Sequence, residues 1–322
     1  MKVAVLCGGR SSEHDVSLRS GEAVARGLRE AGHEALLVTI AREGGWSFHG
    51  APVELTPAGG LQGADVAFPA LHGPFGEDGS VQGVLEWLDV PYVGSDVLAS
   101  AVCMDKLTLK RLFAEAGLPQ VEFVAAGVEG WRERCGELGL PLWVKPSRLG
   151  SSVGISRVEA LGAELDAAVE LALRHDPRVI VEASATGREV ECSLLGNEDV
   201  RPSLPGEVVA HGDWYDYETK YSDGAMELIA PAPLSDEQTA RLQELAIEAF
   251  RLGGCSGLAR CDFFVEPGGA ILVNEINTMP GFTETSVYAK LWEASGLAYP
   301  DLCDRLLQLA LERHAKSRSY EF

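Results

Sequence analysis

Two carboxylates that could do chemistry together, Asp262 and Glu275, lie on either side of a glycine pair. Gly268-Gly269 separates two apolar-rich runs, and such a dipeptide is typical of a two-residue β-hairpin turn. A turn centred there would place Asp262 directly opposite Glu275, and Arg260 opposite Asn277. Because strand side chains alternate between the two faces, all four side chains would project the same way.

Facing carboxylates repel each other unless a cation lies between them. Asp262, Glu275 and the amide oxygen of Asn277 are hard ligands of the kind that Mg²⁺ prefers. A divalent ion held there beside Arg260 would usually have phosphate on its other side. The alternative is an acidic, solvated hairpin in which Arg260 forms a surface ion pair.

The composition narrows the class of protein. A chain of 322 residues is long enough for two or three domains, and 46% hydrophobic with 23% charged residues is ordinary for a soluble globular protein. The net charge of −21 argues against a nucleic-acid partner and requires any nucleotide site to be locally basic. The seven cysteines form no CxxC pair and follow no zinc spacing, which indicates buried thiols in a reducing cytosol. No apolar run approaches about 18 residues, so we expect a cytoplasmic protein with no membrane partner.

The elements that would position these residues alternate as strands and helices, in the manner of α/β units. We expect three such units in series, at residues 1–95, 96–183 and 184–322, the first with a parallel sheet and the last with the hairpin. The expected strands are residues 3–6, 36–40, 66–68, 121–125, 142–145, 153–157, 178–183 and 188–195. One expected helix is indicated by the apolar stripe of Val81, Val84, Leu85 and Leu88. The other expected helices are residues 104–116, 159–174, 235–252 and 300–314, and we expect the tail beyond Arg313 to be frayed.

A glycine turn at Gly8-Gly9 follows the first expected strand, but the GxGxxG spacing of a dinucleotide site is absent. Ser12-x-x-Asp15 fits a capping box and predicts a helix that starts near Glu13. Glu13 is then either a first-turn acid that complements the helix dipole or a group that grips a substrate ammonium. The second interpretation follows from its place at the carboxyl edge of a parallel sheet, where ligands of α/β proteins bind.

Lys145 ends an expected strand, and a glycine- and serine-rich loop follows it. The loop lacks the Gly-Lys-Ser/Thr end of a P-loop, yet its backbone N–H groups and serine hydroxyls could close over phosphates. Lys145 would supply a point charge there, and Lys106 is a second candidate for phosphate contact. The alternatives are a plain flexible hairpin loop and, for Lys106, a surface lysine.

Three other loops carry candidate residues. His72, in a glycine-rich loop after the third strand, is either a hydrogen-bonded structural histidine or a substrate contact. In the loop after the hairpin, Gly281 could present its backbone N–H closely and Ser286 could bond a carboxylate, unless the segment is only a serine-capped Pro-Gly turn. The aromatic stretch 211–221 predicts an ordering lid, with a surface loop as the alternative.

Taken in order, these segments resemble the D-alanine–D-alanine ligases of the ATP-grasp family over nearly the whole chain. The motifs that carry the resemblance are GGRSSEHDVS (8–17), HGPFGEDG (72–79), MDK (104–106), VKPSRLGSSVG (144–154), YDYETKY (215–221) and NEINTMPGFT (274–283). The resemblance implies an ATP-grasp fold with a Rossmann-like N-terminal domain and ATP between the central and C-terminal units. It also implies ATP-dependent ligation of two D-alanines through an acyl phosphate, for a peptidoglycan precursor.

The resemblance assigns roles to residues of this sequence in three groups. The nucleotide group would have Lys106, Lys145, Ser152 and Lys220 near the phosphates, and Glu182 and Glu189 near adenine-side and ribose groups. The metal group would have Asp262, Glu275 and Asn277 around two Mg²⁺ (or Mn²⁺) ions. In the substrate group, Glu13 and His72 would lie near the first D-alanine, and Ser151 and Tyr221 would link Glu13 to the closed loops. Arg260 and the Gly281 N–H would stabilise the oxyanion. Ser286 would bind the carboxylate of the second D-alanine.

The sequence departs from the family pattern at Ala183, where a lysine is expected in many relatives, so adenine contacts there would involve backbone groups only. The retained tyrosine run around Tyr221 predicts D-alanine rather than D-lactate as the second substrate. The alternatives are another ATP-grasp carboxylate–amine ligase (including a D-alanine–D-lactate or D-serine ligase), a non-catalytic nucleotide-binding regulator and a nicotinamide dehydrogenase. A homodimer is expected from the resemblance alone.

Overall fold

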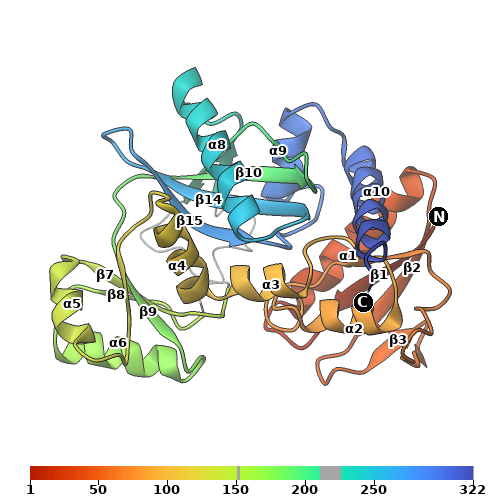
Figure 1. Cartoon of the computed structure of the whole chain (residues 1–322), viewed down its shortest axis with the longest axis horizontal. Coiled ribbons are helices and arrows are strands. Elements are labelled where there is room, and N and C mark those ends of the chain that lie inside the picture. The colour runs from red at the N-terminus through yellow and green to blue at the C-terminus, as the bar shows by residue number, and fades with distance from the viewer. Residues whose placement is uncertain (151–152, 211–225, 322) are drawn as a thin grey trace.

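The computed structural model describes residues 1–150, 153–210 and 226–321, and arranges them around three separate sheets (Figure 1). Helices alternate with strands through most of the chain, as the sequence predicts, which gives a mixed α/β architecture. Within those residues, no helix is long and apolar enough to cross a membrane.

The first sheet has the order β4-β3-β2-β1-β5, and β1 pairs in parallel with both β2 and β5. Its elements are β1 (Lys2–Gly8), α1 (His14–Glu30), β2 (Glu34–Ile40), β3 (Trp46–Phe48), β4 (Ala51–Pro52), β5 (Val66–Pro69) and α2 (Ser80–Leu88). The predicted parallel arrangement is therefore confirmed, and the short antiparallel strands β3 and β4 extend it. At the end of β1, a Cβ on Gly8 would lie 2.3 Å from the Ile40 carbonyl oxygen, so only glycine permits this turn.

The second sheet is antiparallel, with the order β6-β9-β7-β8. Its elements are α3 (Val97–Met104), α4 (Lys106–Ala116), β6 (Phe123–Ala125), α5 (Trp131–Glu137), β7 (Leu142–Pro146), β8 (Ser156–Val158), α6 (Ala163–Leu173) and β9 (Val179–Ala183). The predicted helix over 104–116 is wrong at its start, because Met104 ends α3 and Lys106 begins α4. Asp105 makes the break, since its side chain accepts the Thr108 backbone N–H as the N-cap of α4.

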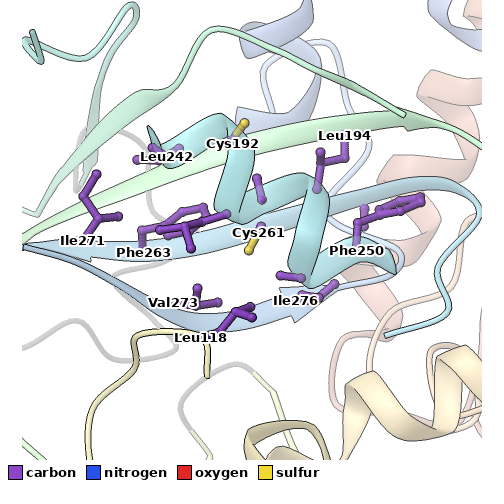
Figure 2. Packing of buried hydrophobic residues seen from close by; sticks show 14 of the residues in the cluster. Leu118, Cys192, Leu194, Leu242, Phe250, Cys261, Phe263, Ile271, Val273 and Ile276 are labelled. Atoms are coloured by element: carbon purple, nitrogen blue, oxygen red, sulfur yellow. The ribbon is translucent and has the colours of Figure 1, made fainter. Parts of the chain in front are cut away.

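The third sheet has the order β13-β12-β10-β14-β15, with β11 beside β10. Its elements and the helices around it are β10 (Arg188–Gly196), β11 (Arg201–Pro202), β12 (Gly206–Ala210), β13 (Met226–Ile229), α8 (Asp236–Leu252), β14 (Gly257–Val265), β15 (Ile271–Asn277), α9 (Val287–Ala294) and α10 (Tyr299–Ser317). Helix α8 covers one face, where Leu242 and Phe250 pack against Cys192, Cys261 and Phe263 (Figure 2). The alternation along β14 turns Arg260 and Asp262 toward the opposite face.

The C-terminal helix α10 returns to the first sheet, where Leu302 and Leu306 share a buried core with Val3 and Val5 (Figure 1). The prediction of a frayed tail beyond Arg313 is wrong, because α10 continues to Ser317. Polar residues at its end find charged partners far away in sequence: Lys316 pairs with Glu198, and Arg318 pairs with Glu86 and Asp89. The three-domain division of the sequence remains a prediction.

Candidate active site

A cavity of about 760 Å³ opens between the loops of the first sheet and the face of the third sheet opposite α8. The predicted site residues that line it are Glu13, His72, Lys106, Arg260, Glu275, Asn277, Gly281 and Ser286. Two of these come from first-sheet loops and five from the hairpin and its following loop, with α4 contributing Lys106. The structure thus brings together residues separated by more than 250 positions in sequence.

The hairpin has the predicted register where the chemistry would occur. Asp262 pairs with Glu275 and Arg260 pairs with Asn277, as the sequence indicates. The predicted two-residue turn is wrong, however, because beyond the site Val265 pairs with Ile271 and the connection is one residue longer. A β-bulge beside Asp262 absorbs the difference, which restores the register at the site.

Arg260 is the centre of charge on this face of the hairpin. Its Nε and Nη2 donate to the two oxygens of Asp262, each at 2.7 Å, and its Nε lies 2.8 Å from Glu191 Oε2. Burial would lower the pKa of Arg260, but Asp262 and Glu191 outweigh burial and raise it. Glu191 was not predicted as a site residue. It lies on β10 directly opposite Asp262 and makes a row of three acids with Glu275, and no local sequence pattern marks that pairing.

The metal ligands predicted from the sequence fit a divalent cation in their chemistry. Asp262 and Glu275 are neighbours across two strands, and Asn277 Nδ2 donates to Asp262 Oδ2 at 2.9 Å, so its amide oxygen is not used in that bond. Glu275 Oε2 lies 3.2 Å from Lys106 Nζ. In the described parts of the chain, no group of three or more His, Cys, Asp or Glu side chains could hold a metal ion. A metal here would therefore depend on two carboxylates, the amide and the substrate's own oxygens.

Lys106 is fixed against the base of the glycine- and serine-rich loop. Its backbone N–H donates to the Ser147 carbonyl oxygen at 3.0 Å, and its Nζ donates to the Leu149 carbonyl oxygen at 3.0 Å. The Ser147 hydroxyl donates to Asp105, whose other oxygen accepts from Arg178. The described start of the loop is therefore held by buried polar contacts, unlike a plain flexible hairpin loop.

Lys145 lies beside Glu182 rather than alone at a strand end. Its Nζ is 2.6 Å from Glu182 Oε2, while Lys110 Nζ lies 3.0 Å from Glu182 Oε1. Burial would raise the pKa of Glu182, but Lys110 and Lys145 outweigh burial and lower it to about 2. Lys110 was not predicted as a site residue, although it lies four residues after Lys106 and so shares its face of α4. Glu189, exposed on β10, contributes to the field that raises the pKa of Lys145.

The first-sheet side of the cavity is formed by two loops that meet at Glu13. The predicted capping box is wrong, because Glu13 and not Ser12 occupies the N-cap of α1, and the Glu13 side chain makes no capping hydrogen bond. Glu13 is 8% exposed, and a Cβ on Gly73 would lie 2.5 Å from its Oε2, so the carboxylate faces the loop after β5. Glu77 in that loop also lines the cavity and was not predicted as a site residue. Burial and Glu13 raise the pKa of Glu77.

His72 links the two sides of the cavity. Its Nδ1 lies 3.0 Å from the Met279 carbonyl oxygen and so carries the proton, while its Nε2 accepts from the Ser20 hydroxyl at 2.8 Å. Burial lowers the pKa of His72, against an opposing effect of Glu13. Both ring nitrogens have protein partners, which favours the structural interpretation of this histidine over a substrate contact.

Ser286 and Gly281 lie side by side at the start of α9. The Ser286 hydroxyl caps no helix N–H. It accepts from the Thr283 backbone N–H at 3.0 Å and lies 2.8 Å from the Thr283 hydroxyl. A Cβ on Gly281 would lie 3.3 Å from Ser286 Oγ, so glycine keeps this approach open. The predicted residues Ser151, Ser152, Lys220 and Tyr221, with the predicted lid, lie outside the described residues.

Family models cover most of the chain. The model of the D-ala D-ala ligase N-terminus matches residues 2–58 and 53–95, and that of the D-ala D-ala ligase C-terminus matches residues 112–308. The D-alanine--D-alanine ligase of Geobacillus kaustophilus is 43% identical, over 100% of this chain and 97% of its own. That of Solibacter usitatus is 44% identical, over 100% and 99%.

Two solved structures have the same architecture over nearly their whole length. The D-alanine-D-alanine ligase of Coxiella burnetii superposes with a TM-score of 0.90 at 36% identity, covering 99% of this chain and 96% of that one. The VanG D-Ala:D-Ser ligase of Enterococcus faecalis superposes with a TM-score of 0.86 at 34% identity, covering 96% and 99%.

Proposed function

The chain belongs to the D-alanine–D-alanine ligase family of ATP-grasp enzymes, and we propose that it joins two D-alanine molecules at the expense of ATP. The observation that carries the proposal is the hairpin face shared by Arg260, Asp262, Glu275 and Asn277, which borders a cavity that Glu13 lines from the first-sheet side. A regulator that only bound nucleotide would not need these groups together. The dehydrogenase alternative does not agree with the family.

The proposed reaction has two steps. A carboxylate oxygen of the first D-alanine attacks the γ-phosphorus of ATP, which gives an acyl phosphate and ADP. The neutral amine of the second D-alanine then attacks the acyl carbon, the amine loses a proton, and inorganic phosphate leaves as the amide bond forms. Such a transfer is accelerated mainly by positioning and by neutralisation of charge.

On the nucleotide side, we assign Lys106 and Lys145 to the phosphate oxygens of ATP, with Ser152 and Lys220 as further proposed contacts. Family membership implies a divalent metal ion, and we assign Asp262, Glu275 and Asn277 as its ligands. When bound, this metal would neutralise charge on the phosphates. Two ions, and Mg²⁺ or Mn²⁺ as their identity, are part of the proposal.

On the substrate side, Glu13 would accept hydrogen bonds from the ammonium of the first D-alanine. Arg260 and the Gly281 N–H would stabilise the oxyanion that forms when the amine attacks the acyl carbon. Ser286 would bind the second carboxylate, and Ser151 and Tyr221 would connect Glu13 to the closed loops. His72 supports the Met279 carbonyl at the entry to the Gly281 loop, so its proposed effect on substrate is through that loop.

The second substrate is the finer part of the proposal, because one structural relative is named for D-serine. We propose D-alanine, on the retained tyrosine run around Tyr221, in a homodimeric cytoplasmic enzyme that contributes to peptidoglycan precursor synthesis. The test is phosphate release and product analysis with ATP, Mg²⁺ and D-alanine, with L-alanine as control and D-serine or D-lactate as competing acceptors. D-Alanyl-D-alanine as the main product supports the assignment, whereas a dominant D-alanyl-D-serine or depsipeptide product contradicts it.

A further inference from the structure

Lys110 is a buried lysine near the proposed phosphate contacts, and the proposed mechanism gives it no task. It lies on α4, its side chain is 2% exposed, and its Nζ is 3.0 Å from Glu182 Oε1. The approach is that of an ion pair rather than of a well-aligned hydrogen bond, since neither atom has a partner of good hydrogen-bond geometry. Burial of a charged lysine costs free energy, so we expect its positive charge to contribute to the site.

The carboxylate of Glu182 is shared between two lysines. Lys110 approaches one oxygen at 3.0 Å and Lys145 approaches the other at 2.6 Å, and the Glu182 side chain is 3% exposed. Two cations and one anion leave one net positive charge in this group. Without Lys110, Lys145 and Glu182 would form a neutral pair that attracts phosphate only weakly.

The position of Lys110 on α4 connects this charge to the rest of the nucleotide site. Lys106, one helical turn earlier, lies beside Glu275 at 3.2 Å and beside the loop at Leu149. One face of α4 therefore carries both a lysine that would meet phosphate and a lysine that compensates the acid behind it. In a chain of net charge −21, such local compensation is what a site for a polyanion requires.

We propose that Lys110 is a positioning residue of the nucleotide site, which neutralises Glu182 from behind so that Lys145 keeps its positive charge for the phosphates of ATP. This inference rests on the proposed ATP-dependent function, and it assigns no contact between Lys110 and the nucleotide. The expected signature is a change in nucleotide affinity that depends on the balance of charge and not on the shape of the lysine.

The test is calorimetric binding of Mg²⁺ with a non-hydrolysable ATP analogue, without D-alanine. Lys110→Met should weaken binding about tenfold, because it leaves the neutral pair of Lys145 and Glu182. The double variant Lys110→Met with Glu182→Gln should bind more tightly than Lys110→Met, because Lys145 is again unshared. Lys290→Met, which removes an exposed lysine on α9, is the control for overall charge and should bind like wild type.

Thermal denaturation establishes that each variant is folded. If Lys110→Met alone does not fold, the double variant is compared with Glu182→Gln instead. Glu182→Gln should then bind the analogue about tenfold more tightly than the double variant does. Unchanged binding in Lys110→Met, or a double variant no better than the single one, would overturn the inference. Wild type that fails to bind the analogue at all would instead overturn the proposed function.

Discussion

Two clusters of charged residues near the proposed active site have opposite balances of charge. On the hairpin side, Arg260 and Lys106 are two cations against the three anions Glu191, Asp262 and Glu275. The other cluster, Lys110, Lys145 and Glu182, has two cations and one anion.

The difference indicates which ligand each cluster suits. A surplus of carboxylate suits a divalent cation, and a surplus of ammonium suits phosphate. Helix α4 joins the two, because Lys106 and Lys110 lie one turn apart on the same face. The same acidic chain can thus hold a metal ion and a polyanion side by side.

Removal of one hairpin carboxylate should have the largest effect. Glu275→Gln keeps the side-chain shape and hydrogen bonding but removes a charge from the proposed metal set. We expect D-alanine-dependent phosphate release to fall at least about 10³-fold, with an unchanged melting temperature. The matched control is Glu244→Gln, an exposed acid on α8. Near-normal activity in Glu275→Gln would remove the metal assignment.

Arg260→Lys separates charge from geometry in the hairpin cluster. The substitution preserves the cluster's net charge but loses the two-pronged bond to Asp262, in which each contact is 2.7 Å. We expect kcat to fall about 10²-fold, since an ammonium cannot reproduce the planar guanidinium. If kcat stayed within about threefold of wild type, net charge alone would explain the cluster and the geometric argument would fail.

Lys106→Met should change the affinities of the two clusters in opposite directions, with stronger metal binding at the hairpin and weaker binding of ATP. The hairpin acids lose a neighbouring cation, so Mn²⁺ binding without nucleotide, followed by electron paramagnetic resonance, should strengthen. ATP affinity should weaken about tenfold, because a phosphate contact is lost. A parallel change of both affinities would show that Lys106 does not connect the clusters in this way.

His72 belongs to neither cluster and provides the smallest expected effect. Since its folded pKa lies below the ordinary value of 6.5, the unfolded chain takes up the proton first as pH falls. Its contribution to stability is therefore complete above pH 6.5 and is lost progressively below it. His72→Asn can still donate to the Met279 carbonyl but does not titrate. Between about pH 7.5 and pH 5.5, the free energy of unfolding measured in denaturant titrations should fall less in the variant than in wild type. An identical loss in both proteins would show that folding does not lower the pKa of His72.

The residues predicted from the sequence were those whose signal is local. The hairpin register at Asp262 and Glu275 followed from a glycine pair and strand alternation, and it holds at the site. The turn itself was wrong, because nothing in the sequence marks the bulge that adds a residue on β15. The break at Asp105 was missed for a similar reason, since its partners Ser147 and Arg178 come from another part of the chain.

Glu191 and Lys110 show why the rest of the site could not be predicted. Each is an ordinary charged residue on a strand or helix, and its role arises only from a partner across the fold. Glu191 meets Arg260 across two strands, and Lys110 meets Glu182 between α4 and β9. The order of strands in a sheet and the packing of a helix on it belong to the tertiary structure, which local sequence patterns do not specify.

The most direct test of the proposed chemistry is the transfer of oxygen from substrate to phosphate. D-Alanine labelled with ¹⁸O in its carboxylate is incubated with ATP, Mg²⁺ and the enzyme, and the released phosphate is examined by mass spectrometry. An acyl-phosphate mechanism predicts one labelled oxygen in inorganic phosphate for each dipeptide formed. Dipeptide formed with unlabelled phosphate, or with the label in AMP, would contradict it.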